Sequence, residues 1–66
     1  MNEAKRKKLK KSVKLTVLAE QAGTSHVYLS KIIHNHAKPS LELADKLAKL
    51  ANQMTFTDSF KAKDFL

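Results

Sequence analysis

The chain has no cysteine, one glycine and one proline, and fewer than half as many acidic as basic residues. Without cysteine, neither a disulfide framework nor a cysteine-based zinc site can stabilise it. Its apolar runs are only a few residues long, which excludes a transmembrane span and the core of a signal peptide. We therefore expect 66 residues to form one small domain stabilised by helix packing, with the cytoplasm as its default location.

The net charge of +7 is concentrated in residues 1–14. This segment carries seven basic side chains and one acid, Glu3, for a net +6, whereas the other 52 residues carry six lysines and five acids, for a net +1. Such asymmetry is typical of proteins that contact nucleic acid or an anionic membrane surface. A solvated, partly disordered tail and a nuclear-localisation-like cluster are the alternatives for the same residues.

Residues 15–34, LTVLAEQAGTSHVYLSKIIH, predict two short helices separated by the only glycine. Gly23 lies where the first helix needs a left-handed residue to end, and Thr24 or Ser25 can cap the second. The inward-facing positions are Leu18, Ala19 and Ala22 before the turn, and Leu29, Ile32 and Ile33 after it. This pattern predicts a helix-turn-helix, a motif that places its second helix in the DNA major groove.

The segments on either side of this motif also favour helices. Residues 1–14 form either a basic helix over 2–11 or a flexible arm, and residues 34–39 form a loop because Pro39 disfavours helical geometry at Lys38. Ser40 is expected to cap a helix over residues 40–52. The apolar face of that helix contains Leu41, Leu43, Ala44, Leu47, Ala48, Leu50, Ala51 and Met54.

The last eleven residues contain three of the four aromatic side chains. Thr55 followed by Asp58 resembles a capping box, which predicts a C-terminal helix over residues 55–66. Phe56 and Phe60 are expected in the core, whereas Phe65 and Leu66 either pack inside or form a dimer contact. The sequence thus predicts an all-α bundle of about five short helices.

Residues 15–50 resemble the lambda-repressor-like (XRE-type) helix-turn-helix family, which includes the phage Cro proteins and repressors. The strings LAEQAG, TSHVYLSKI and KPSLELADKLAKL carry the resemblance. It implies a five-helix domain that binds double-stranded DNA, usually as a homodimer on a pseudo-palindromic operator. The expected function is that of a small Cro-like repressor in the bacterial cytoplasm or nucleoid.

The resemblance also implies which residues contact DNA. The residues expected to contact bases are His26, Val27 and Lys31. They lie on the side of the helix opposite Leu29 and Ile32, and so point away from the core. Lys31 can donate to guanine, Val27 can meet a thymine methyl group, and His26 can donate or accept. Contacts with the DNA backbone are expected from Ser25, Tyr28, Ser30, Asn35, His36 and Lys38, together with Lys7, Lys8, Lys10, Lys11 and Lys14.

The chain departs from the family pattern in three places. Lys14 and Leu15 replace the usual hydroxyl cap and the glutamine after it, so the cap shifts to Thr16 or Lys14 supplies charge instead. The common Glu-Asn-Gly becomes residues 33–35, Ile-His-Asn, which predicts a left-handed Asn35 and a partly exposed Ile33 at a dimer face. The first helix is also unusually basic, with few apolar positions.

Other kinds of function have little support. His34 and His36 lack a third metal ligand at a suitable spacing, and a helical chain of this size has little room for a catalytic pocket, so neither an enzyme nor a cofactor is expected. A membrane-active helix would need a broader apolar face than Leu9 and Val13 supply. RNA recognition would rely on Tyr28 as its only stacking platform. The remaining alternative is an antitoxin-type protein that neutralises a protein partner and autoregulates its operon.

Overall fold

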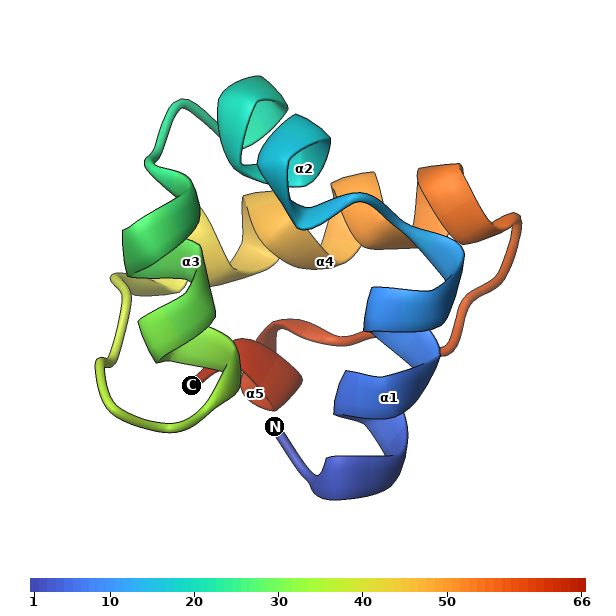
Figure 1. Cartoon of the computed structure of the whole chain (residues 1–66), viewed down its shortest axis with the longest axis horizontal. Helices are drawn as coiled ribbons and strands as arrows, with labels where there is room; N and C mark the ends of the chain where they lie inside the picture. Colours follow the sequence, from blue (N-terminus) through green and yellow to red (C-terminus); the bar gives the residue numbers. More distant parts are fainter.

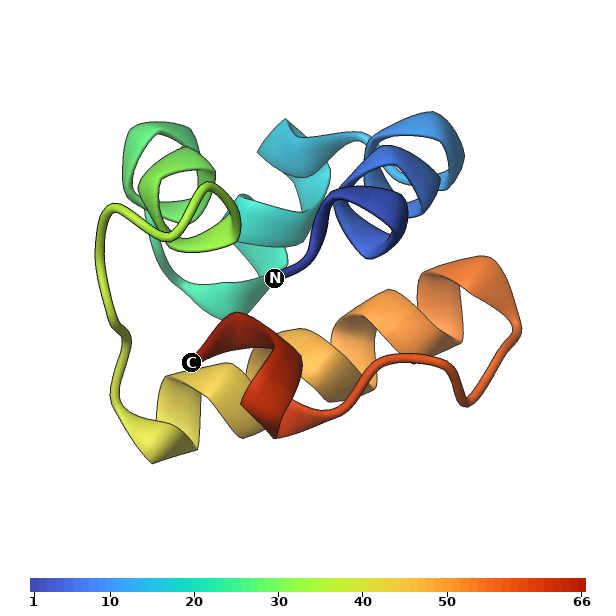
Figure 2. The same cartoon turned by 90° about the horizontal axis from the view of Figure 1, so that it is seen from below.

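Five helices and no strand make up the computed structural model, which describes residues 1–66. The helices are α1 (Glu3–Ser12), α2 (Leu15–Ala22), α3 (His26–Ile33), α4 (Leu41–Thr55) and α5 (Ala62–Phe65). In Figure 2, α1, α2 and α3 form one layer, and α4 with α5 forms the layer beneath it. The predicted all-α class is confirmed. None of the five helices combines the length and apolar character needed to cross a bilayer.

Short polar side chains begin three of the helices. The side chains of Asn2, Ser25 and Ser40 accept backbone N–H groups at the starts of α1, α3 and α4, at 2.8, 3.0 and 3.2 Å. Residues 3–12 therefore form a capped helix. Of the two forms expected for this segment, the structure shows the helix and not the flexible arm. Lys14 is the N-cap residue of α2 and no side chain caps that helix, so of the two alternatives for this position, the cap at Thr16 is wrong.

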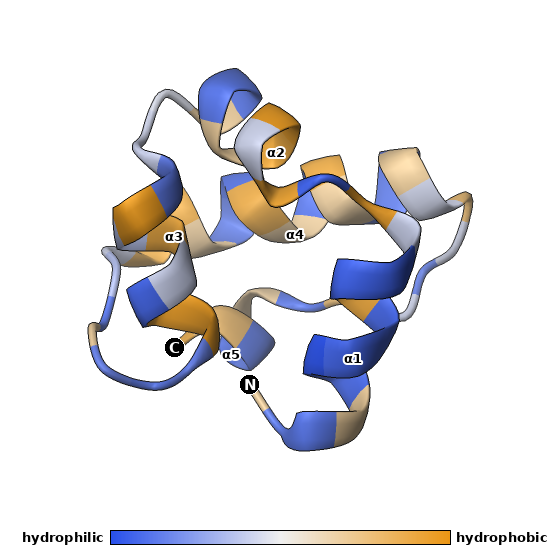
Figure 3. Cartoon of the chain, viewed as in Figure 1, coloured by the Kyte–Doolittle hydropathy of each residue, from blue (hydrophilic) through white to orange (hydrophobic).

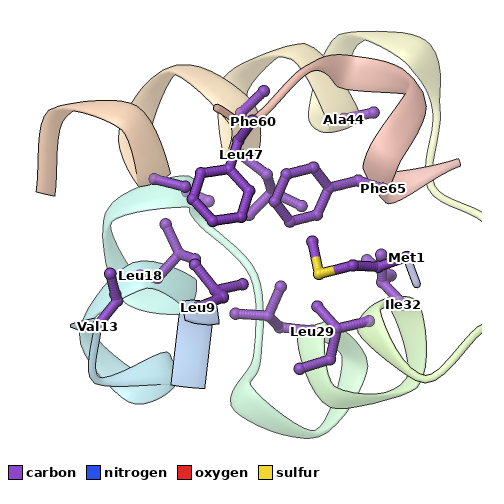
Figure 4. Close-up of a cluster of buried hydrophobic side chains, with 14 of the residues drawn as sticks. Met1, Leu9, Val13, Leu18, Leu29, Ile32, Ala44, Leu47, Phe60 and Phe65 are labelled. Carbon is purple, nitrogen blue, oxygen red and sulfur yellow. The ribbon is translucent and has the colours of Figure 1, made fainter. Parts of the chain in front are cut away.

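All five helices contribute to a single core of fifteen buried apolar side chains. Figure 4 shows Phe60 and Phe65 packed between Leu47 of α4 and the side chains of the upper layer. The two rings are tilted, with centroids 6.4 Å apart, which lies within the range of favourable aromatic pairs. Ile33 is fully buried, so its predicted exposure is wrong: the inner face of α3 includes Ile33 as well as Ile32.

The apolar face of α4 is narrower at its beginning than its sequence suggests. Leu41 was predicted on this face, but its side chain is 67% exposed because it lies in the first turn, beyond the core. The helix is also longer than the predicted range of 40–52, since it continues to Thr55.

The predicted C-terminal helix over residues 55–66 is wrong. Thr55 is the last residue of α4, where its hydroxyl donates to the carbonyl of Ala51 at 2.8 Å, and no capping box forms with Asp58. Residues 56–61 are non-helical because the Asn52 amide pairs with both backbone groups of Phe60, at 2.8 and 2.9 Å. The Asn52 side chain thus pairs with the backbone N–H and carbonyl of Phe60 that would otherwise bond within a helix.

Phe56 is the clearest misplacement by sequence reasoning. It was predicted in the core, yet it is 95% exposed and adopts a left-handed φ of 55° as the C-cap of α4. This backbone conformation turns the chain back and directs the ring outward. The prediction for Phe60 is confirmed, and of the two outcomes considered for the last residues, Phe65 is buried whereas Leu66 is 46% exposed.

Two lysines of α1 fasten the C-terminal segment to the bundle. Lys5 Nζ lies 2.8 Å from Asp64 Oδ2 and donates to the carbonyl of Ser59 at 3.0 Å. Lys8 Nζ donates to the Ser59 hydroxyl at 3.1 Å. Asp64 also accepts the backbone N–H of Lys61 at 2.8 Å, which holds the start of α5.

Acid is expected to weaken this attachment. Burial raises the pKa of Asp64, but hydrogen bonds from Lys5 and the Lys61 backbone outweigh burial and hold the pKa below its ordinary value of 3.8. The pKa of Asp64 is lower in the folded protein than in the unfolded chain. Asp64 therefore stabilises the fold at pH values above 3.8, and this stabilisation is lost as the pH falls through the folded pKa.

We therefore expect Asp64→Asn to lower the free energy of unfolding at pH 7 and to cost less at a pH below 3.8. Urea titrations at both pH values measure the difference. Asp58→Asn is the matched control, because Asp58 is exposed and makes no ion pair. An equal loss at both pH values for Asp64→Asn would contradict the assignment.

Replacing Phe56 should stabilise the protein. A bulky residue in the left-handed region costs about 1–2 kcal/mol, and asparagine tolerates this region better, so Phe56→Asn should raise the free energy of unfolding by roughly 0.5–1 kcal/mol. Phe60→Ala, at a buried ring, should cost about 3–5 kcal/mol in the same urea titrations. Destabilisation by Phe56→Asn would show that the Phe56 ring has a packing role.

Candidate nucleic-acid interface

The turn between α2 and α3 is held by the backbone around Gly23. This residue has a left-handed φ of 77°, and the N–H of Thr24 returns to the carbonyl of Ala19 at 2.9 Å. A Cβ at position 23 would meet no atom within 4 Å, so the conformation rather than lack of space favours glycine there. Ala19 is buried between the helices, and Figure 1 shows α3 leaving the turn at a steep angle to α2.

The side of α3 that faces away from the core carries the three predicted base-contacting residues. His26, Val27 and Lys31 are all exposed, and Val27 remains 64% exposed although it is apolar. Leu29 and Ile32 are buried on the opposite side. The outward row is thus His26, Val27 and Lys31, flanked by the half-buried Tyr28 and Ser30.

A shallow hollow adjoins the beginning of this row. Residues 10–16, from the end of α1 to the first turn of α2, line it together with His26. Lys10, Lys11 and Lys14 make its wall cationic, and Ser12 and Thr16 add hydroxyl groups. The uncapped amide end of α2 lies in the same segment, where its dipole favours a negative charge. The fold thereby brings part of the N-terminal charge beside α3. Figure 3 shows that most residues along α1 are hydrophilic.

A second hollow adjoins the other end of the row, lined by Ser30, Lys31, His34 and His36. The left-handed conformation predicted for Asn35 is present, with φ of 64°. The Asn35 amide donates to the carbonyl of Met1 at 3.1 Å, so this side chain is engaged within the fold. Lys38 is exposed in the loop that follows.

The lysines of α1 divide into groups with different surroundings. Lys8 lies against Ser59 of the C-terminal segment, and Lys7 forms an exposed pair with Glu3 at 3.4 Å. Lys10 Nζ lies 3.1 Å from His34 Nε2, beside the end of α3. The predicted basic set is therefore not one patch, because only its C-terminal part adjoins α3.

Sequence reasoning missed Arg6 as a link between helices. Its Nε donates to the carbonyl of Ile33 at 3.1 Å, where the C-terminal end of α3 carries unpaired carbonyl groups and a partial negative charge. A basic residue near a helix C-terminus is a recognised pattern, but here the two positions are 27 residues apart in sequence. Only the folded arrangement of α1 and α3 reveals the contact.

A model of the helix-turn-helix family matches residues 3–56, which include α1 to α4. The chain belongs to this helix-turn-helix family. It is a DNA-binding helix-turn-helix regulator whose partner is double-stranded DNA, and the resemblance of residues 15–50 is confirmed. No curated protein and no solved structure matches the chain. The exposed residues of the outward row on α3 are therefore the candidates for contacts with DNA.

Proposed function

We propose that this helix-turn-helix protein is a Cro-like transcriptional repressor that binds a pseudo-palindromic operator as a homodimer. The observation that carries the proposal is the exposed row His26, Val27 and Lys31 beside the hollow lined by residues 10–16. A row of polar and apolar side chains on an exposed helix suits base edges, and a neighbouring cationic wall suits phosphates.

Base recognition is assigned to the outward row of α3. Lys31 donates to guanine O6 or N7 in the major groove, and the exposed Val27 contacts a thymine methyl group. His26 lies at the first position of α3 and donates or accepts according to its tautomer. These three side chains supply specificity.

Affinity is assigned to contacts with the DNA backbone. Lys11 and Lys14 approach phosphates from the first hollow, Lys10 from the end of α3, where its ammonium lies beside His34, and Lys38 from the loop, with release of counterions. Polar groups on α3 and beside it complete the set: Ser25, Tyr28, Ser30 and His36. The Asn35 side chain is bonded to Met1, so we assign it no contact with DNA. Because Lys7 and Lys8 are paired with Glu3 and Ser59, we assign them long-range attraction rather than fixed contacts.

Two exposed leucines support the homodimer. Leu41 and Leu66 are 67% and 46% exposed, and they lie at the start of α4 and directly after α5, two helices that pack against each other. An isologous contact through this apolar end gives the two copies a twofold axis, as a pseudo-palindrome requires. The two α3 helices then enter successive major grooves about 34 Å apart, and the bound dimer blocks a promoter.

Phe56 favours a second candidate function, that of an antitoxin-type protein that binds a protein partner and autoregulates its operon. The exposed ring borders a hollow lined by Asn52, Gln53, Thr57 and Asp58. Figures 1 and 2 place this end of α4 away from α3, so a protein and DNA could bind together. An exposed aromatic beside a hollow is a common anchor for a protein partner.

The base contact of Lys31 gives the sharpest test of the proposed function. Lys31→Ala should weaken binding to an operator selected from random duplexes by roughly 1–3 kcal/mol per half-site and relax selection at one base pair. Binding to random DNA should change much less. Titrations at two salt concentrations, with stoichiometry recorded, measure both effects.

Lys46→Gln is the matched control, since Lys46 is an exposed lysine on α4 that makes no ion pair. It should reduce binding to both duplexes slightly and equally. Equal losses on operator and random DNA for Lys31→Ala would remove Lys31 from the base-contacting set. If the wild-type protein preferred no selected sequence, the proposal of a sequence-specific repressor would be contradicted.

A further inference from the structure

His34 joins α1 to the end of α3 through both of its ring nitrogens. Its Nδ1 lies 2.9 Å from the carbonyl oxygen of Ser30, one turn earlier in the chain. Its Nε2 lies 3.1 Å from Nζ of Lys10 on α1. Arg6 forms a second link one turn away on α1, donating to the carbonyl of Ile33. Two basic side chains of α1 thus reach the same end of α3.

Both contacts are hydrogen bonds in only one form of the ring. A carbonyl oxygen only accepts hydrogen bonds, so the proton must be on Nδ1, which donates to Ser30. A lysine ammonium only donates, so Nε2 must carry the lone pair that accepts from Lys10. The contact therefore requires the neutral Nδ1–H tautomer. A charged imidazolium could not accept the hydrogen bond and would place a second positive charge beside Lys10.

The groups that face His34 would not compensate for such a charge. Lys10 and Arg6 approach from α1, Lys31 lies on α3 at the same hollow, and His36 lies in the following loop. No acidic side chain forms a hydrogen bond or an ion pair with His34. Protonation of the ring therefore breaks the contact with Lys10.

The contact limits the freedom of an otherwise mobile side chain. A lysine has a flexible four-carbon stem with about 2 kcal/mol of rotamer entropy, so a free lysine is spread over many positions before it meets a phosphate. The bond to His34 holds the Lys10 ammonium at the end of α3 that also carries Lys31. Two further hydrogens of this ammonium remain able to donate.

We propose that His34 is a positioning residue, whose neutral ring holds Lys10 beside α3 so that α1 presents one DNA phosphate contact in fixed register with Lys31. This inference rests on the proposed function, because it assumes that α3 and Lys10 face the same duplex. It adds that the phosphate contact of Lys10 depends on a histidine one turn after Ser30.

A double-mutant cycle on the selected operator at pH 8 tests the dependence. Lys10→Ala and His34→Leu should each reduce the slope of log K against log salt, counted per bound protomer, by about 1, as expected for one lost phosphate contact in each half-site. The double variant should also lose about 1, because both changes remove the same contact. His34→Gln retains an acceptor and should restore most of the slope, whereas Lys46→Gln is the control away from α3.

Rescue separates positioning from a general structural effect. With glutamine at position 34, Lys10→Ala should still reduce the slope by about 1 per bound protomer, whereas with leucine at position 34 it should have little further effect. Nitrogen-15 NMR of the free protein at pH 8 should show the Nδ1–H tautomer of His34.

Three results would overturn the inference: additive losses near 2 in the slope, no loss from His34→Leu, or an Nε2–H tautomer. If the wild-type protein binds its operator tightly and the losses add, only the role of His34 fails. If the wild-type protein selects no operator, the proposed function fails and this inference fails with it.

Discussion

Burial of one side of α3 is the constraint on which the rest of the structure depends. Leu29, Ile32 and Ile33 are essentially fully buried, so α3 cannot rotate about its axis without exposing them to water. Each such side chain contributes about 1.5–3 kcal/mol when buried. In a chain without disulfides, this packing alone determines which side chains of α3 face outward. His26, Val27 and Lys31 are exposed as a consequence.

The basic N-terminal helix has more than one physical role. Lys5 and Lys8 hold the C-terminal segment, which brings Phe60 and Phe65 into the core. Arg6 and Lys10 contact the end of α3, and the remaining lysines stay in solvent. The concentration of charge therefore does not translate directly into a surface for DNA. Part of it stabilises the same core that orients α3.

Local signals predicted the part of the fold that local interactions determine. The left-handed Gly23 and the cap at Ser40 are short-range features that the sequence predicts, and Ser25 is one of the two caps, with Thr24, that it allows for α3. The C-terminal segment was misread because a capping-box pattern at Thr55 competed with the left-handed Phe56 and with the Asn52 amide, which bonds the backbone of Phe60. Sequence periodicity contains no information about that amide.

In the candidate site, too, the sequence predicts the features that depend on local periodicity and misses those that depend on contacts distant in sequence. Helical periodicity was sufficient to place Val27 and Lys31 on the outer side of α3, opposite Leu29. It could not separate Lys8 from Lys10, because α1 has a single buried anchor, Leu9, and its rotation depends on partners distant in sequence. The contacts of Arg6 and Lys10 with α3 span 27 and 24 residues, so they become visible only in the folded chain.

The most direct test of this account is a map of backbone amide chemical shifts as a selected operator duplex is added. The account predicts large changes at residues 25–31 and 10–16, which form the outward side of α3 and the first hollow. It predicts small changes at residues 52–58, around Phe56. Changes concentrated around Phe56, with α3 unaffected, would contradict the assignment of α3 as the DNA-contacting element.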